Sequence, residues 1–472
     1  MLKGFKKVIG VALATVLTVS ALAGCGTPVN QSGRNADGKI VIKIGGTPVE
    51  RTEKNASTYD LFQANKAAFE AANPDIVVKA DSWSFDLRNY LTKAAAGDLP
   101  TMFYTSPTEL NTLKNSGYIK DVTALAEKYG YAEGYDNEKY GELYMEDDKF
   151  YGLVQDGTLE SIGVMYNKDV MREAGLVDES GKVKVPQTWE ELGEMAGQVK
   201  GKTGKIGFVM PTSKNQGGWL FLNMAWAYGV EFMKQEDSGK WKATFASDEG
   251  VAALEYIKDL KWKYNALQSE TIADVTHQGK YLSTDTAAMT IFSPGIMNNW
   301  VTSYGLDIKK ISMSTNPAGP KGKYSQRNSH IYVFTGTDEQ NEACFKWLDF
   351  LGQGAEVNDK MRKNVEDQAK IKSEKGYPVG WGQIPLWKNE DRIKAIEDVE
   401  APYVNVDKAD YEEYMAGDGV IYQAEPPVCA QQLYSIIDAC LQEVLNNKNA
   451  DCRAILEKAQ NDFQLNYLDK EA

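Results

Sequence analysis

Residues 40–44 read Ile40-Val41-Ile42-Lys43-Ile44, and residues 76–78 read Ile76-Val77-Val78. Both runs are rich in β-branched side chains, which favour strands. Between them, the apolar spacing of residues 57–72 predicts an amphipathic helix that ends at Asn73-Pro74. A strand, a helix and a second strand in this order predict parallel strands in an α/β fold.

The same alternation continues along the chain. No repeat of fixed period is present, which argues against solenoids and propellers. The length of 472 residues is enough for two domains or one large domain. We therefore expect two α/β lobes. The further segments that carry this pattern are a helix at 87–96, strands at 102–104, 206–210 and 287–291, and helices at 251–264, 430–445 and 452–465.

Composition and charge narrow the class of protein. Hydrophobic residues make up 43% and charged residues 25%, as in an ordinary globular protein. The formal net charge is −14, and lysine and arginine are interleaved with acidic residues. Nucleic-acid phosphates would be repelled by such a surface, so no nucleic-acid partner is expected.

The N-terminus resembles a bacterial lipoprotein signal. Three lysines within the first seven residues precede a short apolar run, which ends in Leu22-Ala23-Gly24-Cys25 and resembles a lipobox. The resemblance implies that residues 1–24 are a signal peptide and that a lipid on Cys25 anchors the protein to the outer face of the membrane. Residues 25–38 are then a flexible tether. An ordinary signal peptide with a chance cysteine is the alternative.

Metal and cofactor chemistry has little support in the sequence. The remaining cysteines, Cys344, Cys429, Cys440 and Cys452, show no Cys-x-x-Cys spacing, and only two histidines occur. No metal site and no cofactor are therefore expected. The sequence is compatible with two alternatives, a Cys440–Cys452 disulfide or four free thiols. The acidic residues 136–148 fit no calcium-loop pattern and are expected to be solvated.

Ordered motifs carry a family resemblance over nearly the whole mature chain. They resemble family 1 extracellular solute-binding proteins of bacterial ABC importers. One departure is Thr101, where the family usually has aspartate. Residues 165–170 and 186–192 also have a direct physical meaning, because Asn167 and Thr188 are suited to cap helices. The matching segments are 69–78, 95–100, 117–122, 150–153, 165–170, 173–176, 186–192, 286–290, 317–320 and 343–351.

The resemblance implies a class II periplasmic-binding-protein-like fold, with two lobes and a hinge between them. Residues 39–159 and 316–372 would form the first lobe, and residues 160–315 and 373–472 the second. Crossings are expected near Glu160-Ser161, within residues 311–315 and within residues 371–378. The protein would be a monomer that captures a carbohydrate and delivers it to permease subunits, without being an enzyme.

The aromatic content fits a sugar ligand. The chain has 10 tryptophans and 25 tyrosines, several of them in loops. Such rings stack on the apolar faces of pyranoses, while amides and carboxylates bind the hydroxyls. Trp219 is the first choice, because related sugar binders place a stacking aromatic there. The other candidates are Trp83, Trp300, Trp381, Tyr104, Glu160 and Asn298, at or after expected strands and crossings, and Gln431, which follows Glu425-Pro426-Pro427 before a C-terminal helix.

Three other functions remain as alternatives. A non-sugar solute such as a phosphodiester would call for convergent arginines, and Arg51, Arg88 and Arg327 are scattered in sequence. A glycan-active enzyme needs only a carboxylate pair, which many acidic residues could supply, but no Gly-x-Ser-x-Gly or His-Glu-x-x-His motif occurs. An adhesin or a co-receptor of a sensor is compatible with the same fold.

Overall fold

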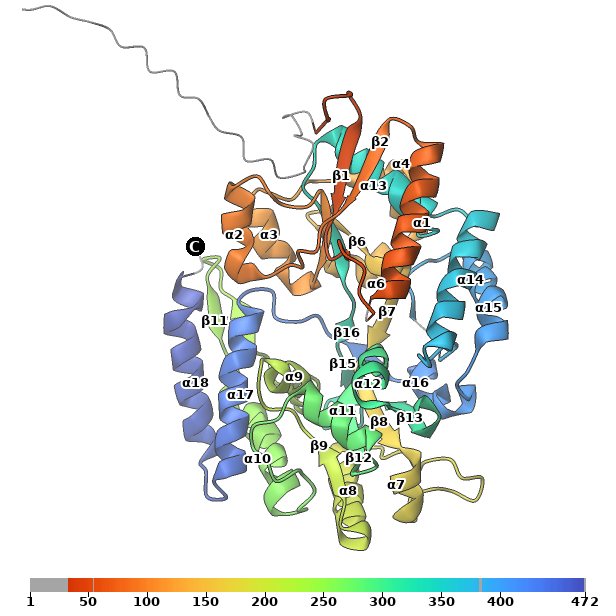
Figure 1. Cartoon of the computed structure of the whole chain (residues 1–472). Coiled ribbons are helices and arrows are strands. Elements are labelled where there is room, and N and C mark those ends of the chain that lie inside the picture. The colour runs from red at the N-terminus through yellow and green to blue at the C-terminus, as the bar shows by residue number, and fades with distance from the viewer. Residues whose placement is uncertain (1–32, 54, 382–383, 471–472) are drawn as a thin grey trace, which may run out of the picture.

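The computed structural model describes residues 33–53, 55–381 and 384–470, and Figure 1 shows two lobes, one above the other. The expected signal peptide (1–24), Cys25 and the first part of the tether lie outside these residues. Among the described residues, no helix combines the length and the apolar character needed to cross a bilayer.

The first lobe is built on a five-stranded sheet of order β2-β1-β3-β17-β6. β1 pairs in parallel with β2 from Ile40↔Ile76 to Ile44↔Ala80, which confirms the predicted parallel pair. β17 runs antiparallel between β3 and β6, because the chain returns from the other lobe to fill that position. The strands are β1 (Ile40–Ile44), β2 (Ile76–Ala80), β3 (Met102–Thr105), β6 (Gly152–Val154) and β17 (Ile331–Phe334), and the main helices are α1 (Ala56–Ala72), α2 (Leu87–Ala95), α3 (Leu110–Asn115), α4 (Thr123–Lys128), α6 (Asn137–Tyr140) and α13 (Asp338–Phe350).

The second lobe is built on a four-stranded mixed sheet of order β13-β8-β12-β9. β12 is parallel to β9 and antiparallel to β8. The strands are β8 (Gly163–Asn167), β9 (Ile206–Val209), β12 (Ala287–Phe292) and β13 (Ile311–Thr315), and the helices around them are α7 (Lys168–Glu173), α8 (Trp189–Thr203), α9 (Gln216–Tyr228), α10 (Asp248–Trp262), α11 (Val275–Ser283), α12 (Ile296–Tyr304), α17 (Ala430–Asn446) and α18 (Cys452–Asn466).

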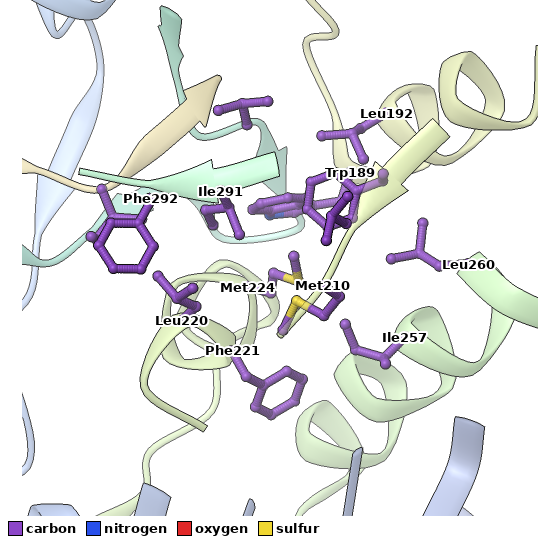
Figure 2. Close-up of a cluster of buried hydrophobic side chains, with 14 of the residues drawn as sticks. Trp189, Leu192, Met210, Leu220, Phe221, Met224, Ile257, Leu260, Ile291 and Phe292 are labelled. Atoms are coloured by element: carbon purple, nitrogen blue, oxygen red, sulfur yellow. The ribbon is translucent and has the colours of Figure 1, made fainter. Parts of the chain in front are cut away.

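Each lobe has its own apolar core. In the second lobe, Trp189 of α8 is fully buried and lies among the side chains of β9, α9, α10 and β12, as Figure 2 shows. The hydroxyl of Thr188 caps α8 by accepting the backbone N–H of Glu191 at 3.1 Å, as the sequence predicted. The cap fixes where the helix begins and thereby which residues face the core.

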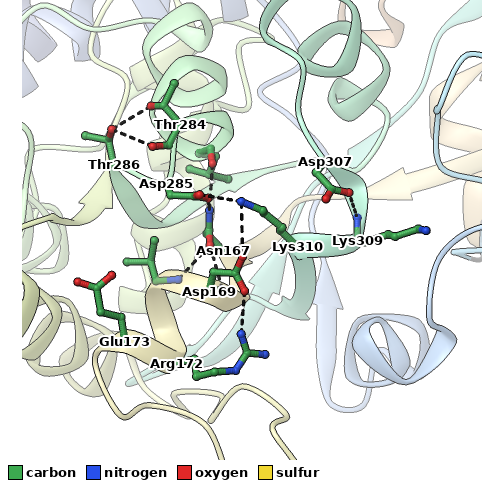
Figure 3. Close-up of polar contacts among 12 residues, drawn as sticks. Asn167, Asp169, Arg172, Glu173, Thr284, Asp285, Thr286, Asp307, Lys309 and Lys310 are labelled. Carbon is green, nitrogen blue, oxygen red and sulfur yellow. Dashed lines mark hydrogen bonds and ion pairs between the residues drawn. The ribbon is translucent and has the colours of Figure 1, made fainter.

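Asn167 has the scaffold role predicted from the sequence (Figure 3). Its carbonyl oxygen accepts the backbone N–H groups of Asp169 and Val170 at 3.0 and 3.1 Å, which caps α7. Its amide donates to Asp285 at 2.8 Å, and Lys310 binds the same carboxylate at 2.7 Å. These contacts join the ends of β8 and β12, so they stabilise the sheet.

Three short strands form a strip, and two of them, β7 (Thr158–Ser161) and β16 (Arg327–Asn328), lie between the lobes in Figure 1. β7 pairs with β16 on one side and with β18 (Ile384–Pro385) on the other. Residues 311–315 were expected to be a crossing, but β13 pairs with β8 along all five residues and belongs to the second-lobe sheet. The chain leaves that lobe later, at β16.

The expected lobe boundaries need correction at two places. β14 (Ala318–Gly319) and β15 (Gly322–Ser325) form a sheet with β19 (Val420–Tyr422), and β15 contacts α9 of the second lobe. Leu386 and Trp387 are buried in the first-lobe core. Segment 318–325 therefore lies with the second lobe, where the first was expected, and segment 386–387 lies with the first lobe, where the second was expected.

The remaining elements are β4 (Met145–Glu146), β5 (Lys149–Phe150), α5 (Tyr131–Gly134), β10 (Met233–Gln235), β11 (Trp241–Ala243), α14 (Asp359–Glu374), α15 (Glu390–Glu400) and α16 (Glu412–Ala416).

The cysteines within the described residues do not form the candidate disulfide. Cys440 and Cys452 are free and buried, as is Cys344. Burial raises the pKa of each of these three thiols. No group of three or more His, Cys, Asp or Glu residues in this part of the chain is arranged to hold a metal ion.

Candidate functional site

A cavity of about 180 Å³ lies where the two lobes and the strip between them meet. This volume is below the range of about 300–1,000 Å³ typical of ligand pockets. A neighbouring cavity of about 450 Å³ shares the Glu425 wall. The first cavity is lined by Ser106 and Pro107 after β3, by Lys214, Asn215, Gln216 and Trp219 at the start of α9, by Arg327 and Ser329 at β16, and by Glu425, Gln431 and Tyr434 around the start of α17.

A strained turn places the α9 residues in the cavity wall. Lys214 and Asn215 both have left-handed backbone conformations, with φ of 58° and 68°. Such conformations are uncommon outside glycine and concentrate at functional sites. Asp438 of α17 holds the turn by accepting the backbone N–H groups of Asn215 at 2.6 Å and Gly218 at 2.8 Å. The Asn215 amide also donates to Gln431 at 3.1 Å, so two helices present their amides together.

Trp219 provides the aromatic part of the wall. Its ring meets Phe292 edge-on, with centroids 5.4 Å apart, and the side chain is half-buried. Its side chain and the Tyr434 hydroxyl are both hydrogen-bonded to the carboxylate of Glu425. A polar contact therefore fixes the orientation of the indole, and Trp219 and Glu425 both line the cavity.

Glu425 has an unusual protonation equilibrium. Burial raises the pKa of its carboxyl to about 7, against the hydrogen bonds from Tyr434 and Trp219, and the nearby charge of Glu109 adds to the increase. Glu109 comes from the first lobe, is itself 7% exposed, and has a pKa raised by burial. Two acidic groups from different parts of the chain thus approach each other at the edge of the cavity.

Two cations line the cavity, and each already has an anionic partner. Lys214 pairs with Asp274 at 2.5 Å. Burial works to raise the pKa of Asp274, but the hydrogen bonds from Lys214 and His277 outweigh it and hold this pKa well below its usual range. Arg327 pairs with Glu142 at 3.0 Å. The wall is therefore polar, but its positive charges are locally compensated.

Arg327 is held rigidly by two aromatic rings. Its guanidinium carbon lies 4.5 Å from the ring centroids of both Tyr140 and Tyr422. The side chain is only 9% exposed. Since Tyr140 belongs to the first lobe and Tyr422 to β19, this contact fixes Arg327 between two parts of the chain that are distant in sequence.

Two of the eight predicted ligand-binding residues, Trp219 and Gln431, line this cavity. Tyr104 lies nearby in β3, two residues before Ser106, but its ring packs edge-on against His330 with centroids 5.6 Å apart. Tyr104 is not among the residues that line the cavity.

The other three predicted tryptophans occupy different environments. Trp83 packs on Phe103 in the first-lobe core, with centroids 5.2 Å apart. Trp300 is 0% exposed, so it offers no surface to a ligand. Trp381 is 7% exposed and lines a separate, largely apolar cavity of about 120 Å³ beside α14 and α15.

Glu160 and Asn298 lie at α12, away from the lining residues. The carboxylate of Glu160 accepts the backbone N–H of Gly295 at 3.0 Å, which holds the start of α12 against β7. Burial raises the pKa of Glu160. Asn298 is half-buried within α12, where its backbone carbonyl accepts the hydroxyl of Thr302 at 3.0 Å.

Sequence reasoning missed most of the cavity-lining side chains. Arg327 enters the sequence analysis only as one of three scattered arginines, and a single sequence gives no signal that it lines the same cavity as Trp219. Tyr434 lies one helical turn after the predicted Gln431, so the same helix face was a signal for it. Glu425 lies in the loop before α17, six residues before Gln431. Asn215 and Gln216 are separated from Trp219 only by Gly217 and Gly218, and this polar pair before an aromatic near a helix start was the available signal.

Comparisons with known proteins agree with this architecture. The chain is 23% identical over 391 residues to the putative ABC transporter periplasmic-binding protein YcjN of Escherichia coli, covering 81% of this chain and 83% of YcjN. The maltose-bound structure of MalE3 from T. maritima matches with a TM-score of 0.64 and 18% identity, over 90% of this chain and 99% of MalE3. UgpB from Mycobacterium tuberculosis with glycerophosphocholine matches with a TM-score of 0.65 and 16% identity, over 91% of this chain and 98% of UgpB.

These structural matches confirm the expected two-lobed α/β fold. The family model described as bacterial extracellular solute-binding protein matches residues 53–355, which is more than half of the chain. The chain therefore belongs to the bacterial extracellular solute-binding protein family.

Proposed function

We propose that this protein is the substrate-binding component of an ABC importer, which captures an extracellular carbohydrate between its lobes and delivers it to the permease. Membership in a solute-binding family confirms the expectation that the chain is not an enzyme. The observation that carries the carbohydrate assignment is the position of Trp219, whose fixed ring lines the cavity beside the amides of Asn215 and Gln431.

The chemistry of this wall suits a sugar. A pyranose ring has apolar C–H faces that stack on an indole, and hydroxyls that both donate and accept hydrogen bonds. The amides of Asn215, Gln216 and Gln431 can do the same. The maltose in the MalE3 structure supports a carbohydrate on this fold.

A phosphodiester solute is the second candidate, because UgpB holds glycerophosphocholine on the same fold. The two cations at the cavity make this candidate less favourable. Lys214 is paired with Asp274 and Arg327 with Glu142, so a phosphate would find little uncompensated positive charge. The carbohydrate therefore remains the proposal.

The proposal includes the membrane arrangement predicted from the N-terminus. A lipid on Cys25 would anchor a monomeric protein at the outer face of the membrane, where the permease also opens. The support is the Leu22-Ala23-Gly24-Cys25 motif. Replacement of Cys25 by serine, followed by fractionation of cells, tests this part: the variant is expected in the soluble fraction, and retention at the membrane would contradict it.

The ligand class is tested first by thermal shift. Mature protein beginning after Cys25 is screened against oligosaccharides, amino acids, polyamines and glycerophosphodiesters. A ligand present at 100 times its dissociation constant stabilises the folded state by about 2.7 kcal/mol, which is readily visible. A response only to glycerophosphodiesters would replace the carbohydrate assignment by the second candidate.

Calorimetry with the best oligosaccharide then tests Trp219. We expect Trp219→Ala to weaken binding at least tenfold, or about 1.4 kcal/mol, because the stacking surface is lost. Trp83→Ala is the matched control, since Trp83 is also half-buried but packs in the first-lobe core. The control is expected to lower the melting temperature and to keep the affinity. Equal affinities for wild type and a folded Trp219→Ala would remove Trp219 from the site.

A further inference from the structure

The segment at β16 carries two polar atoms that have no partner among the described residues. These atoms are Nε of Arg327 and Oγ of Ser329, and both are buried. Both residues line the cavity. Buried polar atoms in folded proteins are nearly always hydrogen-bonded, so each exception calls for a physical explanation.

Arg327 cannot turn to satisfy its free N–H group. One terminal nitrogen is bound to Glu142 at 3.0 Å, and the guanidinium plane is held between Tyr140 and Tyr422. The Nε–H group therefore points in a direction set by three other residues. A donor held in this way is preorganised for an acceptor that arrives with the ligand.

We propose that one hydroxyl of the bound ligand forms hydrogen bonds with both groups, Nε–H of Arg327 and Oγ of Ser329. Nε–H of Arg327 donates to the hydroxyl oxygen, and the hydroxyl hydrogen is donated to Oγ of Ser329. A hydroxyl suits this pair of groups, because it accepts from Nε–H and can exchange a hydrogen bond with the Ser329 hydroxyl in either direction. The inference rests on the proposed function and specifies the ligand further, as a neutral sugar that presents a free hydroxyl to β16 while its ring lies against Trp219.

The charge balance favours a neutral ligand over an acidic sugar. The single charge of Arg327 is already compensated by Glu142. A uronate carboxylate in the place of the hydroxyl would put a second anion beside the guanidinium that Glu142 already binds. Like charges brought together in a partly buried site disfavour each other. The charge balance at Arg327 therefore disfavours the uronic acid analogue.

The position of the pair also connects binding to the strip between the lobes. β16 pairs with β7 and lies between the lobes in Figure 1. A ligand that bonds to Arg327 and Ser329 thus contacts the crossing strand itself and not only the two lobes.

Ser329→Ala tests the proposal against a matched control. Ser312 in β13 also has a buried Oγ without a partner in the described chain, but it is not among the residues that line the cavity. Removal of either orphan hydroxyl is expected to leave the melting temperature of the ligand-free protein unchanged or higher. Only Ser329→Ala is expected to raise the dissociation constant of the oligosaccharide, by at least fivefold.

A set of monodeoxy sugars provides a second measurement. One deoxy analogue should lose at least fivefold in affinity for wild type and much less for Ser329→Ala, because the missing contact is then already absent. The corresponding uronic acid should bind wild type more weakly than the neutral sugar. Equal affinities of wild type and Ser329→Ala for every analogue would overturn the inference. A wild type that binds no carbohydrate would instead overturn the proposed function.

Discussion

Glu425 both lines the cavity and has a pKa that burial raises. Its carboxylate is hydrogen-bonded to the Tyr434 hydroxyl and to the Trp219 side chain, and it separates two cavities. A partly desolvated acid in this position fixes the aromatic wall, but its ionised form is disfavoured by burial. Protonation of Glu425 and the stability of the folded protein must therefore be linked.

This linkage predicts how Glu425→Gln depends on pH. The pKa of Glu425 is raised from 4.5 to about 7, so between these values the folded protein keeps a proton that the unfolded chain has released. Stability contributed by this group is complete below pH 4.5 and is lost as the pH rises toward 7. The neutral glutamine avoids the loss. The melting temperature of Glu425→Gln minus that of wild type should increase from pH 4.5 to pH 8. A constant difference would contradict the raised pKa.

At the scale of elements, the close contact between α9 and α17 shapes the cavity. Two glycines at the start of α9 make this contact possible. A Cβ atom at Gly218 would lie 2.2 Å from the carbonyl oxygen of Tyr434, and one at Gly217 would lie 2.6 Å from Asp438. Because Asp438 also binds the first backbone N–H groups of this turn, the helices and the cavity wall form one unit.

Gly218→Ala should therefore reverse the usual effect of alanine in a helix. An unhindered Gly→Ala change in a helix interior stabilises by about 0.8–1 kcal/mol. At Gly218 the overlap with the α17 backbone should instead destabilise by about 1–3 kcal/mol, and ligand affinity should fall because the Asn215 turn shifts. Gly201→Ala in α8 is the control, since its Cβ meets nothing within 4 Å. Thermal unfolding followed by circular dichroism measures both variants, and stabilisation by both would refute this packing argument.

Elements and site residues differ in how far the sequence predicts them. The β1–α1–β2 unit was predictable because residues 40–78 carry local periodicity and a clear helix stop. The sequence did not distinguish the tryptophans in this way. Trp219 and Trp300 both lie near the start of a helix, yet Trp219 lines the cavity and Trp300 is 0% exposed. Their difference arises from which helix packs over each ring. This packing is part of the tertiary structure, as is the approach of Arg327 to Tyr140, and local sequence patterns do not encode either.

For the whole molecule, the question is what holds the two lobes together without ligand. Arg327 at the crossing strand contacts Glu142 and Tyr140 of the first lobe and Tyr422 of β19, which pairs with the second-lobe strand β15. The small cavity of about 180 Å³ indicates lobes that are close together. The ion pair with Glu142 is therefore expected to favour closed lobes before ligand arrives.

Glu142→Gln should shift the ligand-free protein toward an open form. The change keeps the shape of the side chain but removes the charge that holds Arg327. Small-angle scattering should give a larger radius of gyration for the ligand-free variant than for wild type, and equal radii at saturating ligand. Ligand affinity should fall a few-fold, because the binding-competent state is less populated. Glu138→Gln removes the same charge from an exposed position in α6 and should behave as wild type. Identical ligand-free radii for Glu142→Gln and wild type would show that the pair does not hold the lobes.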